Sequence, residues 1–309
     1  MEIRVLRYFL EVAREENITR AAARLHITQP TLTRQLHQLE AELGKKLYVR
    51  GNYNIRLTEE GVLLRERAQE IIDLEEKARS ELTAVQDEVS GVIYIGAGET
   101  VGIRYIAAVL RRLRERYPNV RYHMISADGD GVAEKLDKGL IDFGIFVGKV
   151  GLDKYDHLVL PDVDTWGVLL LKDDPLAEQG FARPEDLLGR PLLFSRQAMA
   201  EGELADWLGY PMEQLDIAGA HNLAYNASVM VREGLGAALT IEGIINTTGR
   251  SALRFVPLRP EVTARLVLAW RRGALFSQAA AKFLEMARGE LDASTTPEPQ
   301  GQKGDRSHV

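Results

Sequence analysis

The chain contains no cysteine among its 309 residues. This absence excludes disulfide bonds, thiolate metal ligands, cysteine nucleophiles and any switch that depends on thiol oxidation. No segment approaches the roughly 18 consecutive apolar residues that a membrane-spanning helix needs, and the charged start MEIRVLR is not typical of a signal peptide. We therefore expect a cytoplasmic protein that has no membrane partner.

Catalytic and cofactor motifs are also missing. Six scattered histidines form no HExxH pair, and the sequence holds no GxSxG motif. Asp128 and Asp130 are typical of a turn and a helix cap rather than of a paired acid and base. The segment GAGETVG follows a GxGxxxG spacing, whereas a dinucleotide-binding loop is GxGxxG near the N-terminus. We expect neither an enzyme nor a protein with a cofactor or metal.

Charge is divided unevenly along the chain. The whole sequence carries −6, but residues 1–60 hold ten Lys or Arg and eight Asp or Glu, which is +2 and leaves −8 for the remainder. A mildly basic segment attached to an acidic body suits sequence-specific DNA binding by an oligomer better than nonspecific coating of nucleic acid. The length allows one small domain and a larger one of one or two lobes.

Residues 17–43 predict two short helices joined by a tight turn. We expect Thr19 to cap the first helix and Thr28 to cap the second, with Pro30 in its first turn, where proline loses no hydrogen bond. Steps of four, three and four keep one face of the second helix in a core; its apolar residues are Leu32, Leu36, Leu39 and Leu43. An apolar stripe over residues 3–13 predicts a third helix on the same core.

The opposite face of the second helix carries hydroxyl, amide, guanidinium and imidazole groups. Such groups hydrogen-bond base edges and phosphates, although an ordinary solvated surface is an alternative for this helix taken alone. The candidate DNA-binding residues of the two helices are Thr19, Thr28, Gln29, Pro30, Thr31, Thr33, Arg34 and His37.

The segment KKLYVRGNYNIRLT alternates polar and apolar residues around Gly51 and Asn52, which predicts a β-hairpin. Arg50 and Arg56 lie on its two arms. Arginines in such a wing grip phosphates or enter the minor groove while a helix occupies the major groove, so we add both to the DNA-binding candidates.

The run from Tyr8 to Gly61, with AAARLHITQPTLTRQLHQLEAELGKKLYVR and LTEEG, resembles the winged domain of LysR-type transcriptional regulators. The resemblance implies a winged helix-turn-helix domain over residues 1–60, with its motif at about 18–37, that binds double-stranded promoter DNA. Thr28 and Thr33 stand where the family more often has serine. The turn GNYN is less basic than is usual, so it would neutralise fewer phosphates.

A heptad pattern follows from Glu59 to about Val89, with the polar Glu75 among its seam residues. The apolar seam residues are Leu64, Ala68, Ile71, Ala78, Leu82, Val85 and Val89. A seam of this length predicts a partner helix, and a helix that lies on its own protein is the alternative. The resemblance implies a linker helix over residues 58–89 that assembles a homodimer or homotetramer.

Beyond Gly91, short apolar strands alternate with helices, which predicts a parallel sheet covered on both faces. The resemblance implies an α/β, periplasmic-binding-protein-like effector domain over residues 91–291. Lobe I would span about 91–162 and 268–291, lobe II about 163–267, with crossings near 161–164 and 266–269. Residues 292–309, rich in Pro, Gly and small polar residues, predict a disordered tail.

A small-molecule effector is expected between the lobes, where helix N-termini present free amides. The resemblance places a ligand-contacting hydroxyl at Thr100. The candidate effector-binding residues are Glu99, Thr100, Val101, Ser126, Gly129, Ser195, Arg196 and Asn222. Glu99 would repel a carboxylate, so either it points away or the ligand is cationic or rich in hydroxyls.

A rival hypothesis is a solute-type binding protein whose N-terminal helices serve a partner other than DNA. Its two-lobed domain would show the same sequence pattern. An exported protein of that class needs an export signal, which this sequence does not display.

Overall fold

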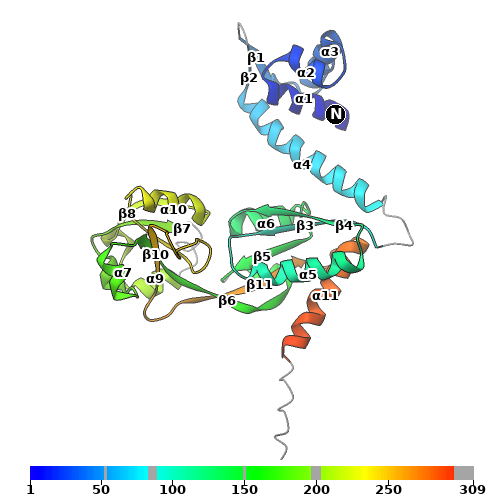
Figure 1. The fold of residues 1–309 in the computed structure, drawn as a ribbon. Helices are drawn as coiled ribbons and strands as arrows, with labels where there is room; N and C mark the ends of the chain where they lie inside the picture. Colours follow the sequence, from blue (N-terminus) through cyan, green and yellow to red (C-terminus); the bar gives the residue numbers. More distant parts are fainter. Residues whose placement is uncertain (52–53, 83–88, 149–150, 196–202, 296–309) are drawn as a thin grey trace, which may run out of the picture. The chain divides into compact units, whose positions relative to one another are not determined.

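The structure is a computed structural model that describes residues 1–51, 54–82, 89–148, 151–195 and 203–295. The chain divides into two compact units, Met1–Thr83 and Ala84–Val309. The first unit is mainly helical with one hairpin, and the second combines a sheet with helices (Figure 1). None of the described helices is long and apolar enough to span a membrane.

The N-terminal unit opens with α1 (Ile3–Glu15), α2 (Ile18–Arg24) and α3 (Gln29–Leu43) around one core. Thr28 caps α3 by accepting a hydrogen bond from the Thr31 amide, and Pro30 lies in its first turn, as predicted. Helix α3 ends where Gly44 adopts the left-handed region, with φ of 65°. The predicted apolar face is buried at Leu32, Leu36 and Leu39, whereas Leu43 is exposed.

The cap of α2 differs from the prediction. The side-chain oxygen of Asn17 accepts hydrogen bonds from the amides of Thr19 and Arg20, each at 3.0 Å. Because the Asn17 carboxamide reaches these amides, α2 begins at Ile18 and Thr19 lies inside its first turn. The expectation that Thr19 caps this helix is wrong.

The predicted hairpin is confirmed. Strands β1 (Tyr48–Arg50) and β2 (Ile55–Leu57) pair antiparallel, with Val49 opposite Arg56. The Gly51 amide donates to the Asn54 carbonyl at 2.8 Å and closes the turn. Asn52 lies outside the described residues.

Glu40 joins α3 to the start of the hairpin. Its side chain is buried, and its Oε1 accepts a hydrogen bond from the Leu47 amide at 2.9 Å while Oε2 pairs with Lys46 at 2.8 Å. Burial opposes ionisation, but these two donors outweigh it and lower the pKa of the carboxyl. A buried and ionised glutamate therefore sets the position of β1 relative to α3.

Helix α4 (Glu59–Leu82) buries only part of the predicted seam. Ala68 and Ile72 are buried against Leu6 of α1, with Leu64 partly buried beside them. The remaining described seam residues of the helix, Ile71, Ala78 and Leu82, are exposed. The alternative of a helix lying on its own protein therefore holds for the first part of the seam, and pairing of the exposed part with a partner helix stays a prediction.

Glu75, the polar residue of the predicted seam, forms hydrogen bonds within the chain. Glu75 accepts hydrogen bonds from Arg7 at 2.8 Å and from Arg79 at 2.5 Å. The bond from Arg79 is the largest of the effects that lower the pKa of Glu75, followed by the bond from Arg7. Val89 lies outside any helix and packs against the core of the second unit, and Val85 lies outside the described residues.

The second unit contains a nine-stranded sheet in two parts that share β6 (Tyr155–Leu171). We call the first part the first half-sheet. Its strands run in the order β4-β3-β5-β11-β6, with bounds β3 (Gly91–Ala97), β4 (Val120–Ser126), β5 (Phe143–Val147) and β11 (Thr263–Arg271).

Helices cover both faces of the first half-sheet. Helices α5 (Ile103–Arg116) and α11 (Gln278–Thr295) pack on one face around Phe143 and Ile145. Helix α6 (Gly129–Asp137) packs on the other face against Phe146. Figure 1 shows α5 and α11 on the opposite side of the strands from α6.

The second half-sheet contains the later part of β6 and the strands β7 (Pro191–Ser195), β8 (Asp216–His221), β9 (Ala237–Ile241) and β10 (Leu253–Pro257). Helix α10 (Ala224–Arg232) packs on one face. Helices α7 (Pro175–Gln179) and α9 (Glu203–Leu208) bury residues in the larger core on the other face. Short 3₁₀ turns lie at Leu152–Lys154, Pro184–Leu187 and Met212–Gln214.

The sheet is mixed, which corrects the expectation of a parallel sheet. Strand β3 pairs parallel with β4 and β5, and β7 with β8 and β9, but β11 is antiparallel to both β5 and β6. Antiparallel β11 results because the chain returns to the first half-sheet after completing the second. Alternation of strands and helices along the chain does not reveal the direction of such a return strand.

Two further boundaries differ from the predictions. Leu266–Ala269 pair with β5 inside the first half-sheet, so the return crossing precedes them and lies near Thr263–Arg265. Asp292–Thr295 continue α11 rather than starting a disordered tail, and residues 296–309 lie outside the described part. The forward crossing follows the prediction approximately, because β6 pairs with β11 through Thr165 and with β9 from Trp166.

Replacing Glu40 should destabilise the N-terminal unit. We expect Glu40→Gln to lower its free energy of unfolding by about 1–3 kcal/mol, because the change removes a buried charge-assisted hydrogen bond. The loss should shrink as the pH falls, since a carboxyl with a lowered folded pKa contributes stability above its unfolded pKa and loses it on acidification. Urea unfolding at several pH values measures both effects, and Glu66→Gln, at an exposed position on α4, is the control.

Candidate functional site

The first candidate site is the exposed face of α3. Thr31, Arg34 and His37 are exposed on this face, and Thr33 is half-buried. Two local hydrogen bonds order the polar groups: the Thr28 and Thr31 hydroxyls lie 2.8 Å apart, and Gln29 Nε2 donates to Thr33 Oγ1 at 2.9 Å. The start of α3 therefore presents an ordered row of polar groups to solvent.

Arg34 is the cation of this face that stays available. Arg20 and Arg24 of α2 pair with Glu15 at 3.3 and 2.9 Å, respectively. Among the residues that the structure describes, no carboxylate pairs with Arg34. A guanidinium without an internal partner is suited to a guanine edge or a phosphate.

The other predicted DNA-binding residues surround this face or lie on the hairpin. Thr19 is exposed on α2, and Gln29 and Pro30 are exposed in the first turn of α3. Arg56 is exposed on β2, and Arg50 belongs to β1. The contact of each of these residues with DNA remains a prediction.

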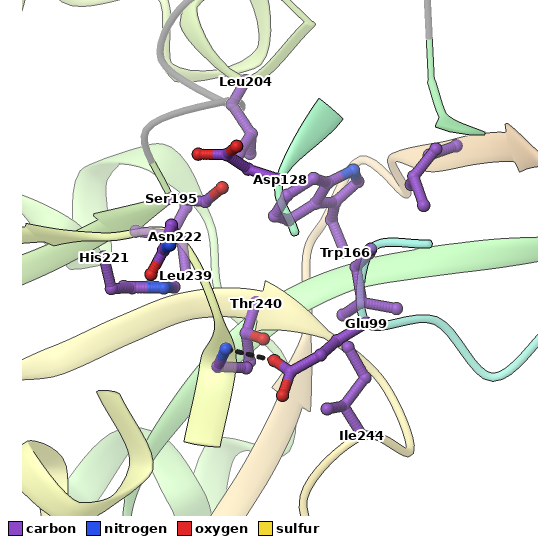
Figure 2. Close-up of a pocket in the computed structure, with 15 residues that line it drawn as sticks. Glu99, Asp128, Trp166, Ser195, Leu204, His221, Asn222, Leu239, Thr240 and Ile244 are labelled. Carbon is purple, nitrogen blue, oxygen red and sulfur yellow. Dashed lines mark hydrogen bonds between the residues drawn. The ribbon is translucent and has the colours of Figure 1, made fainter. Parts of the chain in front are cut away.

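The second candidate site is a cavity between the two half-sheets, with about 670 Å³ of space that includes open solvent at its mouth. The first half-sheet contributes the ends of β3 and β5 and the loop before α6, and the second contributes β7, β8, β9 and the start of α10. Figure 2 shows the polar and apolar groups around it. The lining residues are Gly98, Glu99, Asp128, Val147, Trp166, Ser195, Leu204, His221, Asn222, Ala224, Leu239, Thr240, Ile241, Ile244 and Ala264.

The structure brings together only part of the predicted effector set. Glu99, Ser195 and Asn222 line the cavity. A neighbouring hollow shares Gly98, Glu99 and Ile244 with it, and three predicted residues line that hollow instead: Thr100, Val101 and Ser126. Gly129 lines neither and is the buried first residue of α6, and Arg196 lies outside the described residues.

Glu99 bridges the two half-sheets. It follows β3, and its Oε2 accepts a hydrogen bond from the backbone amide of Ala224, the first residue of α10 (Figure 2). The N-terminus of a helix has unpaired amides and a positive dipole end, which favour an anion. A carboxylate of the chain itself therefore occupies the helix end where an anionic ligand would otherwise bind.

Thr100 is engaged inside the protein. It is buried, its hydroxyl accepts a hydrogen bond from the Gly102 amide at 3.0 Å, and its side chain lies near the buried Asp164 of β6. Burial raises the pKa of Asp164, and the bonds from Thr100 and the Val101 backbone partly oppose that shift. The Thr100 hydroxyl therefore stabilises the turn that leads from β3 into α5.

His221 ends β8 and lines the cavity. Both ring nitrogens are buried and make no hydrogen bond of ordinary geometry among the described residues. Burial lowers the pKa of His221, and the backbone of Leu239 and of Leu223 opposes the shift only in part. The imidazole is therefore neutral at pH 7.

Sequence reasoning missed several lining residues. Trp166, Leu239 and Ile244 appear in the sequence as ordinary apolar residues, and His221 as one scattered histidine. Asp128 was predicted only as a helix cap; it does cap α6 through the Gly131 amide at 3.1 Å, and it also lines the cavity. The position of Asp128 after a strand was the one available signal.

Comparison with known protein families gives two matches. The profile of the LysR substrate binding domain matches residues 86–292. The profile of the bacterial regulatory helix-turn-helix protein, lysR family, matches residues 3–62. These ranges cover the described cavity and the three N-terminal helices with the hairpin.

Curated relatives match over nearly their whole length. The HTH-type transcriptional regulator BsdA of Bacillus subtilis (strain 168) is 29% identical over 298 residues, which cover 93% of this chain and 100% of BsdA. The Hca operon transcriptional activator HcaR of Escherichia coli (strain K12) is 29% identical over 280 residues, which cover 89% of this chain and 93% of HcaR.

Solved structures share the fold. Full-length CbnR in complex with its target DNA aligns with a TM-score of 0.69 and 21% identity, covering 94% of this chain and 99% of CbnR. Full-length BenM aligns with a TM-score of 0.53 and 23% identity, covering 97% of this chain and 100% of BenM.

Acidification should lower the stability of the second unit through protonation of His221. Because burial lowers its folded pKa below the unfolded value, the unfolded state takes up the proton first, and stability is lost as the pH falls below about 6.5. We expect the melting temperature of the wild type to fall more between pH 7.5 and pH 5.5 than that of His221→Gln, by a few degrees. Equal pH dependence of the two proteins would contradict this expectation, and His157→Gln, at an exposed position, is the control.

Proposed function

The chain belongs to the LysR family of transcriptional regulators, and from this premise we propose that it binds promoter DNA sequence-specifically as an oligomer, under the control of a small molecule held in the cavity between the half-sheets. The family assignment supplies a helix-turn-helix DNA-binding domain and an effector-binding domain. The partners, the oligomeric state and the contact residues are parts of the proposal.

The DNA-binding proposal rests on the polar groups that α3 exposes. The exposed face combines the unpaired guanidinium of Arg34 with the hydroxyls and amide at the helix start, the groups that bind base edges in a major groove. The complex of CbnR with its target DNA, a structure with the same fold, supports this use of the domain.

An apolar stripe on α4 supports assembly. Leu63, Ile71, Leu74 and Leu82 are exposed on the described chain, at 57%, 37%, 46% and 86% respectively. At 100° per residue the four side chains, with Ala78, fall within about 100° of the helix circumference. A stripe of this width is suited to pairing with the same helix of a second copy.

The cavity supports control by a ligand because residues of both half-sheets line it. A ligand that contacts both halves favours whichever arrangement of the halves offers it more contacts. The strands β6 and β11 join the halves, so a ligand-dependent change between them has a defined place to occur.

Footprinting on the DNA upstream of the chain's own gene tests the proposal directly. We expect protection of an interrupted dyad, at a stated salt concentration because phosphate contacts make affinity depend on salt. The absence of protection at every salt concentration would contradict DNA binding and would favour a binding protein whose N-terminal helices serve another partner.

Removing the free guanidinium of α3 should weaken operator binding. We expect Arg34→Ala to reduce affinity by about 1–3 kcal/mol, the usual value of a good base contact. A gel shift on the footprinted fragment measures the change. Arg14→Ala on α1, also an exposed arginine, should leave affinity nearly unchanged, and equal losses in both variants would remove Arg34 from the site.

A charge in the α4 stripe should prevent assembly. We expect Leu74→Asp to sediment as a monomer at micromolar concentration, because pairing would bury an uncompensated carboxylate. Glu66→Asp, an exposed position outside the stripe, should sediment like the wild type. An assembled Leu74→Asp protein would show that another surface holds the subunits together.

A further inference from the structure

The charge of the cavity lining limits the ligands that it can accept. Glu99 and Asp128 contribute two carboxylates. Among the described residues that line the cavity there is no lysine or arginine, and His221 is neutral at pH 7 for the reason given above. In the described part of the lining, a ligand therefore meets negative charge without a compensating cation.

The first amide of the helix end that would attract an anion is already engaged. The amide of Ala224 at the start of α10 donates to Glu99, which reaches it from the other half-sheet. An anionic ligand would have to displace Glu99 and would then lie near a free carboxylate in a partly dehydrated space. Both steps disfavour an anion.

The remaining groups favour a cation with an apolar body. Trp166 is only 9% exposed and presents an aromatic surface to the cavity, and an aromatic face attracts an organic cation (Figure 2). Leu204, Leu239 and Ile244 supply the apolar part of the lining. The buried and unpartnered nitrogens of His221 offer a further hydrogen-bonding group to a ligand.

We propose that the cavity binds a small organic cation, a protonated primary amine with an apolar body, and that Asp128 and Glu99 neutralise its charge. This inference rests on the proposed function, because it names the chemical class of the effector of that same cavity. Asp128 accepts a hydrogen bond from the Gly131 amide through Oδ1. Its carboxylate can therefore cap α6 and interact with a ligand at the same time.

Matched probes of equal shape and different charge test the proposal. Benzylamine, benzyl alcohol and benzoate share one ring, and butylamine, butanol and butyrate form a smaller set. Titration calorimetry on the full-length protein should give binding for at least one amine, roughly tenfold tighter than for the alcohol or the carboxylate of the same set. A carboxylate that binds as tightly as its matched amine overturns the proposal, as does the absence of binding by both amines.

Three variants locate the charge. Asp128→Asn keeps the helix cap, because asparagine caps as well as aspartate, and it should weaken amine binding roughly tenfold. Asp130→Asn, two residues along and exposed, should bind like the wild type. Glu99→Gln keeps an oxygen for the Ala224 amide and should also weaken amine binding, whereas unchanged amine binding in both Asp128→Asn and Glu99→Gln would overturn the assignment.

The footprint separates this inference from the proposed function. Operator protection without amine binding overturns the cation site and leaves the regulator intact. Amine binding without operator protection supports the cation site and contradicts the DNA-binding function of the chain.

Discussion

The antiparallel pairing of β6 with β11 is the constraint on which the effector-binding unit depends. The two strands pair from Tyr155 opposite Arg271 to Thr165 opposite Thr263, and β6 then continues into the second half-sheet. Because one continuous strand belongs to both half-sheets, the loops at their facing ends meet around one cavity. Asp164 lies on this strand near the buried Thr100, so the loop that carries Glu99 passes close to the same crossing.

The cavity is lined by groups that favour ligands of opposite charge. The helix end of α10 favours an anion, and the chain supplies one through Glu99. Asp128 adds a second carboxylate, and burial lowers the pKa of His221, so this residue adds no compensating charge at pH 7. The electrostatic character of the site therefore follows from burial and from one contact between the halves, and it differs from what a helix N-terminus alone would suggest.

The N-terminal unit also depends on buried charge and on helices with two different faces. Glu40 is ionised in the core because Lys46 and the Leu47 amide bond to it, and this fixes the hairpin beside α3. Helix α4 uses Ala68 and Ile72 to pack on α1, which leaves Ile71 and Leu74 exposed on a separate face. One helix can thus stabilise its own unit and still present an apolar stripe to another copy.

The sequence by itself determined the three N-terminal helices, the hairpin, the alternation of strands and helices in the second unit and the presence of Glu99 at a strand end, because periodicity and caps act between near neighbours. Only the tertiary structure decided that Asn17 displaces Thr19 as a cap, that only the first part of the α4 seam is buried, that β11 is antiparallel, and that Thr100 is buried near Asp164. It also brought Trp166 and His221 to one cavity. These outcomes depend on competition between groups and on contacts between residues far apart in the chain, which local pattern does not encode.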